Sequence, residues 1–201
     1  MKNTLLTLAL ALVVSNANAG VSGDIAKNPV LPPPVAPAPA CNNISYNFFE
    51  ASWLHSFAGE GADGFGVALN KSIAGNLFAT ADYNQFFSPD QFDVAGGLGY
   101  FVPVTSCVHW VTKASLVYSE TDFDDAFSGS AGTGFRIGLS QWLQLDVFYH
   151  AFWYDFDELT HSGSAALIFR EILAPNVDVI VSGSAGEEDY QAISAGFRYN
   201  F

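Results

Sequence analysis

The sequence is poor in positive charge and has no long hydrophobic run beyond its first twenty residues. Only 7 Lys and Arg stand against 20 Asp and Glu, a net charge of −13, and no basic stripe occurs, which argues against binding to nucleic acid. Half of the residues are nevertheless hydrophobic, and no later run approaches the roughly 20 residues of a membrane helix. The apolar side chains must therefore be buried by alternation along strands.

The first 41 residues have the composition of an export leader followed by a spacer. Residues 1–19 combine one lysine, the apolar run "LLTLALALVV" and the small-residue ending "ANA", which together predict a cleaved signal peptide. Residues 20–41 are proline-rich and predict an extended spacer. A lipid anchor on Cys41 is the alternative, but "PAPA" before it is a poor match to a lipidation signal. One domain, residues 42–201, follows.

Ten segments of this domain alternate between an apolar and a polar face, as β-strands do when their two faces meet different environments. The C-terminal segment is the clearest, with Phe197, Tyr199 and Phe201 on one face and small or polar residues on the other. The segments are 44–54, 63–73, 76–87, 91–102, 107–119, 131–140, 142–154, 161–171, 176–184 and 190–201. Eight strands are the alternative, because 44–54 and 161–171 alternate weakly.

The connections between these segments are of two kinds. Short ones such as "IAGN" and "LAPN" alternate with mostly longer, acidic ones such as "SETDFDDAFSGS". This organisation predicts an all-β fold, an antiparallel up-and-down transmembrane barrel. A soluble sandwich or lipocalin-like barrel is the alternative. The polar faces are dominated by Gly, Ala and Ser, and they hold four of the six Lys and Arg beyond residue 19, which favours the membrane barrel.

The chain resembles the small outer-membrane β-barrel proteins of Gram-negative bacteria over residues 44–201, most specifically in its aromatic ending. "GFGVALNKSIAGNLFATADYN" and "GGLGYFVPV" resemble a barrel family of mostly unassigned function, from which the cysteine in "TSCVHW" departs. The resemblance implies a monomer in the cell outer membrane, with short turns and the spacer in the periplasm. It also implies contacts with membrane lipid, lipopolysaccharide and periplasmic chaperones, and an assembly machinery that reads Phe197, Tyr199 and Phe201.

The inward faces carry nearly balanced charge. They contain four cations and five acids: Lys113, Arg136, Arg170 and Arg198 with Glu50, Asp82, Asp93, Asp146 and Asp178. Because unpaired buried charges are costly, we expect these groups to form a structural ion-pair network. Barrels of about eight strands have interiors just filled by side chains, so ten strands predict a filled lumen. A narrow polar pathway is the alternative.

We find no constellation of residues typical of an enzyme. His150 and Asp146 share a strand and a face but lie roughly 13 Å apart, too far for contact. No metal-ligand spacing occurs, and the acidic loops lack a calcium-binding pattern. We therefore expect no catalytic residue, metal or cofactor. The predicted function is a structural, surface-interaction or minor-permeability role, with a narrow pore as the first alternative and an enzyme acting on lipid or peptide as the second.

The two cysteines, Cys41 and Cys107, both fall on the side of the short turns. An exported compartment is oxidising, which favours a disulfide between them. The first and fifth strands are not neighbours, however, so the spacer would have to cross the barrel to reach Cys107. Free thiols therefore remain the alternative.

Overall fold

The computed structural model describes residues 41, 44–58, 61–87, 90–121, 125–154, 158–187 and 190–201. The predicted signal peptide, and the predicted spacer apart from Cys41, lie outside these residues. The described residues form ten strands: β1 (Phe48–Ser56), β2 (Ala62–Ala74), β3 (Leu77–Phe87), β4 (Asp90–Pro103), β5 (Val108–Thr121), β6 (Asp125–Gly138), β7 (Leu143–Tyr154), β8 (Glu158–Ala174), β9 (Val177–Gly186) and β10 (Gln191–Asn200). The same residues contain no helix long and apolar enough to cross a membrane.

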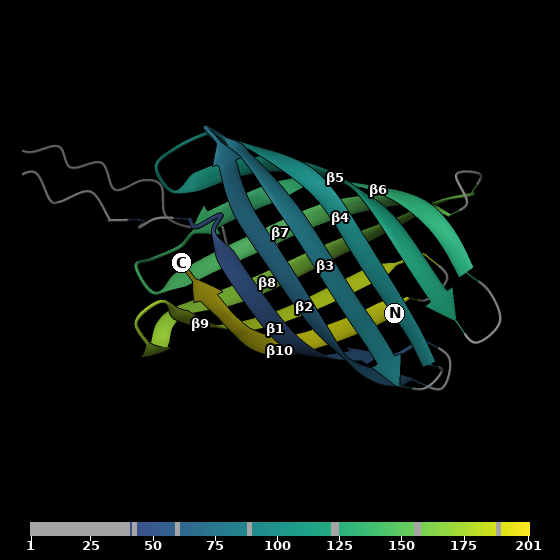
Figure 1. The fold of residues 1–201 in the computed structure, drawn as a ribbon. Coiled ribbons are helices and arrows are strands. Elements are labelled where there is room, and N and C mark those ends of the chain that lie inside the picture. Colours follow the sequence, from purple (N-terminus) through teal and green to yellow (C-terminus); the bar gives the residue numbers. More distant parts are fainter. Residues whose placement is uncertain are drawn as a thin grey trace, which may run out of the picture. The chain divides into compact units, whose positions relative to one another are not determined.

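The strands close into one antiparallel barrel, in which each strand pairs with its neighbours in the chain (Figure 1). Closure comes from β1, which pairs with β2 on one side and with β10 on the other. No sheet edge is left open, as a membrane barrel requires. The prediction of ten strands is confirmed. The weakly alternating segment 161–171 lies inside β8, which at 17 residues is the longest strand.

The apolar faces of the strands point outward. On β10, the exposed fraction is 55% for Phe197, 6% for Arg198 and 50% for Tyr199. Large exposed apolar side chains occur on the outer faces of all ten strands, including Trp53, Leu69, Leu98, Leu116, Leu167 and Val181. A soluble β-barrel would have the opposite arrangement, so this exterior is built for a lipid surrounding.

The two ends of the barrel differ. One end, which we call the turn end, holds the connections 75–76, 104–107, 139–142 and 175–176 together with the C-terminus (Figure 1). Gly75 and Asn176 have positive φ angles of 54° and 65°, as residues in tight turns often do. At the opposite end, the loop end, the acidic segment "SETDFDDAFSGS" is largely strand, because β5 continues to Thr121 and β6 begins at Asp125.

Candidate functional site in the barrel lumen

The segment Ile44–Asn47, which we call the plug, lies in the turn end of the lumen. Its central residue, Tyr46, is 4% exposed and packs in a cluster with Phe78 of β3 and Val111 of β5. The Tyr46 ring also stacks on Phe101 of β4. The plug leads directly into β1 but contacts β3, β4 and β5. It therefore extends across the end of the barrel.

Polar contacts hold the plug at both of its sides. The Tyr46 hydroxyl lies 3.2 Å from Nδ1 of His109, and burial raises the pKa of the Tyr46 phenol, which keeps it protonated. Asn47 accepts hydrogen bonds from two backbone N–H groups, at Oδ1 from Ser72 (2.9 Å) and at its carbonyl from Phe201 (3.1 Å). The plug is thus tied to β2, β5 and the C-terminus.

A disulfide anchors the chain three residues before the plug. Cys41 is bonded to Cys107, in the turn between β4 and β5, with Cα atoms 5.0 Å apart. Cys107 is itself held by β6, because its carbonyl accepts a 2.8 Å hydrogen bond from Gly138 N–H. The bridge therefore links a residue that precedes β1 to the turn that precedes β5, although β1 and β5 are not neighbours in the barrel.

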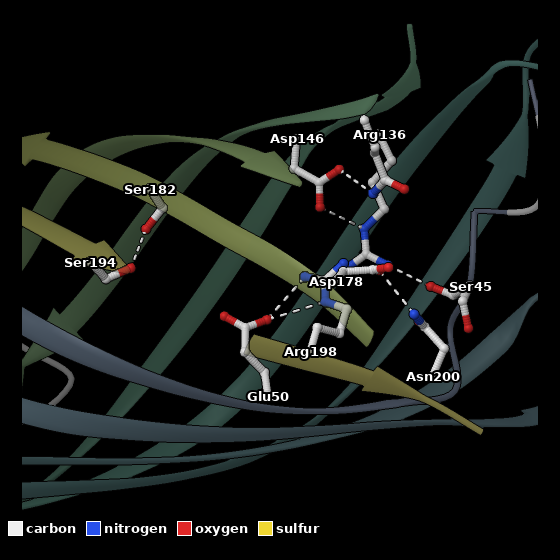
Figure 2. Close-up of polar contacts among 10 residues, drawn as sticks. Ser45, Glu50, Arg136, Asp146, Asp178, Ser182, Ser194, Arg198 and Asn200 are labelled. Atoms are coloured by element: carbon white, nitrogen blue, oxygen red, sulfur yellow. Dashed lines mark hydrogen bonds and ion pairs between the residues drawn. The ribbon is translucent and has the colours of Figure 1, made fainter. Parts of the chain in front are cut away.

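Arg136 of β6 lies beneath the plug and joins it to the barrel wall (Figure 2). Its Nε lies 3.3 Å from Oδ2 of Asp146, and both side chains are less than 10% exposed. This contact is an ion pair without hydrogen-bond alignment, since Nε finds no acceptor among the described residues. Nη1 of Arg136 donates to the Ser45 carbonyl at 3.3 Å, and Gln144 donates to Asp146 at 2.6 Å.

A second ion pair lies at the junction of β1 and β10. Nε and Nη2 of Arg198 donate to Oε2 of Glu50 at 3.3 and 3.0 Å (Figure 2). The guanidinium carbon of Arg198 also lies 3.9 Å from the ring centroid of Phe48, and that of Arg136 lies 5.5 Å from it. Phe48, 2% exposed, therefore packs between the two arginines.

The remaining charged residues of the predicted network have other neighbours. Asp178 accepts hydrogen bonds from Asn200 Nδ2 (2.9 Å) and from the backbone N–H of Glu171 (3.1 Å). Asp82 accepts one from Thr80 at 3.0 Å. Lys113 has no carboxylate partner in the described part of the chain; its Nζ lies 5.7 Å from the ring centroid of Phe148. Arg170, of β8, is half-buried.

Aromatic side chains fill space that inward glycines leave. The Phe78 ring occupies the position where a side chain on Gly99 would begin. A Cβ added to Gly134 would first meet the backbone carbonyl of Val147 and would lie 2.8 Å from both Cα and Cδ1 of Phe148. These aromatics from β3 and β7 occupy part of the turn half of the lumen.

The loop half of the lumen is lined differently, by small polar side chains. Ser182 and Ser194 share a 2.6 Å hydrogen bond, and His150 Nε2 lies 3.0 Å from Ser164 Oγ. Between β1, β3, β4, β9 and β10 a cavity of about 160 Å³ remains. Of the predicted charged residues, only Asp93 lines this cavity.

Tyr46, the serines and the His150–Ser164 contact were not predicted from the sequence. Segment 44–54 was expected to be strand throughout, whereas β1 begins at Phe48 because Ile44–Asn47 turn into the lumen. The serines are neutral and common on every polar face, so no pattern distinguished those that line the cavity.

The predicted assembly signal lies on the outside. Phe197, Tyr199 and Phe201 are each at least 50% exposed on the lipid-facing side. The Lys71 ammonium lies 4.8 Å from the Phe201 ring centroid, which brings the end of the chain against β2.

A closed, ten-stranded barrel with an apolar exterior and a polar interior can be compared with solved structures. The NanC porin superposes with a TM-score of 0.57 at 5% sequence identity, over 76% of this chain and 100% of NanC. The chain has the outer-membrane β-barrel fold. The KdgM porin gives a TM-score of 0.45 at 8% identity, over 76% and 99% of the two chains. Neisserial surface protein A gives 0.38 at 15% identity, over 77% and 95%.

At these identities the likeness concerns the fold alone. No protein-family model and no curated protein matches the sequence. Together with its lipid-facing exterior, the fold is that of a protein of the outer membrane; in such barrels the short turns face the periplasm.

Proposed function

We propose that this outer-membrane barrel is closed to steady solute flow and serves a structural or surface-interaction role, with at most minor permeability. The plug carries this proposal. Tyr46 is almost completely buried at the periplasmic end of the lumen, where it contacts three strands. Below it, two arginines and their carboxylate partners occupy the cross-section. An ion that entered from the loop end would have to displace these groups to leave.

A narrow pore for small polar solutes or ions is the second candidate. The polar cavity of about 160 Å³ in the loop half favours it, because that half is not filled. The solved structures of NanC and KdgM are of porins, although their likeness to this chain extends only to the fold. In this case the plug would be a gate rather than a permanent seal.

An enzyme acting on lipid or peptide is the third candidate, and the lumen supports it least. The contact between His150 and Ser164 resembles half of a nucleophile–base pair. Such a base needs an orienting acid at its other nitrogen. Nδ1 of His150 instead faces Gly132, whose added Cβ would lie 2.9 Å from Nδ1 and 3.3 Å from the Lys113 side chain. The Lys113 ammonium at this position would repel the positive charge that the imidazole gains when it accepts a proton from the nucleophile.

Conductance in planar lipid bilayers separates the first two candidates. The full chain, refolded and inserted, is expected to give little or no steady current in 1 M KCl. At this salt concentration the Debye length is only about 3 Å, so surface charge has little effect on the current. A large, stable conductance from the unmutated protein would reject the closed barrel and favour the pore. Insertion is checked separately, in vesicles of the same lipid, by resistance of the barrel to added protease.

A further inference from the structure

The cavity in the loop half of the lumen combines one carboxylate with aromatic and hydroxyl groups. We call it the cup. Asn84 and Asp93, which pair directly across β3 and β4, form one side. Ser182, Ser184 and Ser194 of β9 and β10 form the other side. Phe86 and Tyr190 complete the wall toward the loop end.

Glycines of β2 keep the cup open. Gly64 and Gly66 are the inward residues of β2 between the two sides, and both are buried. A Cβ added to Gly66 would lie 2.6 Å from Oδ1 of Asn84 and 3.4 Å from Cδ1 of Leu54. An apolar cavity of about 150 Å³ can hold a molecule of the size of benzene. The cup, at about 160 Å³, therefore has room for one six-membered ring or a chain of similar size.

The carboxylate of the cup is uncompensated. Within the described part of the chain, Asp93 has neither a hydrogen-bond partner nor an ion-pair partner. Lys113 lies six residues along β5 from Ser119, the residue paired with Asp93, a separation of about 20 Å along the strand. Arg136 and Arg198 are at the turn end, where they pair with Asp146 and Glu50. The cup is thus a negative site.

The loop end adds to this negative potential. The exposed acids there include Asp63, Glu120, Asp125 and Glu187, and the whole chain carries a net charge of −13. Acids around an opening raise the local concentration of cations. A metal ion is a poor match, because the described residues contain no group of three His, Cys, Asp or Glu side chains that could hold one. Aromatic walls beside a single carboxylate suit an organic cation instead.

We propose that the cup binds a small organic ammonium ion of about six to eight heavy atoms. Its charged nitrogen pairs with Asp93 and donates to the Asn84 carbonyl oxygen or a serine hydroxyl. Its carbon skeleton packs against Phe86 and Tyr190. This site does not depend on whether the barrel conducts, since the ligand enters and leaves by the loop end.

Isothermal titration of the refolded full chain in a non-ionic detergent tests the proposal with three probes of one ring size. Cyclohexylammonium is expected to bind, whereas cyclohexanol and cyclohexanecarboxylate bind at least tenfold more weakly. Equal binding of cyclohexanol, tighter binding of the carboxylate, or binding of none of the three would overturn the proposal. This comparison uses the unmutated protein and so does not depend on the folding of any variant.

Two variants locate the site. Asp93→Asn is expected to weaken cyclohexylammonium binding at least tenfold, and Gly66→Ala to weaken it similarly, by pushing the Asn84 amide into the cup. Asp63→Asn removes the same charge at the loop end outside the cup, and should change the affinity less than threefold. Unchanged affinity in Asp93→Asn, or an equal loss in Asp63→Asn, would show that general charge rather than the cup attracts the probe.

Discussion

Tyr46 stacks on Phe101 with ring centroids 4.1 Å apart and ring planes only 6° from parallel. The contact joins a residue that precedes the first strand to the turn end of β4. The His109 ring lies nearly parallel to both, with its centroid 5.2 Å from that of Phe101 and 5.9 Å from that of Tyr46. Three rings from separate parts of the chain therefore pack together at the turn end of the lumen, and they determine what a variant of Tyr46 should do.

Tyr46→Ala is expected to open the turn end of the barrel. The substitution removes the buried ring that packs with Phe78 and Val111, leaves Ile44 as the other plug side chain at this cluster, and creates a cavity beside Phe78 and Phe101. In planar bilayers the variant should show discrete channel openings, whereas the unmutated protein should show almost no current. Tyr46→Phe is the matched control, because it keeps the ring and loses only the hydroxyl contact with His109. An unchanged current in Tyr46→Ala would mean that the deeper arginine pairs alone seal the lumen.

The disulfide between Cys41 and Cys107 should protect both thiols and stabilise the barrel. Thiol labelling of the native, unreduced protein should therefore modify neither cysteine, and labelling after reduction should modify both. The bridge spans 66 residues, so chain-entropy arguments allow a loss of up to about 4 kcal/mol in Cys41→Ser/Cys107→Ser. Urea-induced unfolding in detergent measures this loss. Free thiols in the unreduced protein would contradict the bridge.

Removal of both members of the Arg198–Glu50 pair should cost less than the sum of the two single removals. Arg198→Ala leaves Glu50 without its cation in a largely enclosed lumen, and we expect a loss of about 3 kcal/mol. The double variant with Glu50→Ala should be less destabilised than the sum of the two single variants, as a double-mutant cycle by urea unfolding would show. Simple additivity would indicate that water screens the pair.

The sequence was sufficient for the fold because the two faces of each strand meet such different environments. Along β10, the lipid-facing residues Phe197 and Tyr199 flank Arg198 in the chain, and this alternation can be recognised in the sequence alone. The start of β1 was harder to predict, since Tyr46 is as apolar as a strand residue. Its burial results from tertiary contacts with β3, β4 and β5, for which the sequence holds no local signal.

The charged residues of the lumen could be named but not paired. Arg136 and Asp146 lie opposite one another across the β6–β7 hairpin, so the length of a short turn already implies their approach. Arg198 meets Glu50 only through the register that closes the barrel between β1 and β10, which no turn determines. The cup is harder still, because its neutral Asn84 and Ser184 come from opposite sides of the lumen.

Removal of Phe201 should impair assembly in cells more than the stability of the finished barrel. Its side chain is 52% exposed to lipid, and its main structural contacts are the Lys71 ammonium and a backbone hydrogen bond to Asn47. We expect a marked fall in outer-membrane yield with little change in the urea midpoint of the refolded protein. Phe135→Ala is the control, since it removes an equally lipid-facing ring (45% exposed) away from the terminus. Normal yield of the truncated chain would refute the role in assembly.

Two glycines of β4 provide a direct test of how tightly the turn half of the lumen is packed. Gly99 faces inward, where a methyl group would overlap the ring of Phe78, which is 1% exposed and cannot easily move. Gly96 faces lipid, and no atom lies within 4 Å of the position of an added Cβ. Gly99→Ala should therefore destabilise the barrel by roughly 1–3 kcal/mol, as overpacking typically does. Gly96→Ala on the same strand should change the free energy of unfolding by less than about 0.5 kcal/mol.

Because both variants exchange the same two residue types, differences in strand propensity cancel and the comparison isolates the contact with Phe78. Equal stability of the two variants in urea unfolding would mean that the Phe78 ring can move aside, and that the lumen is not filled at this level.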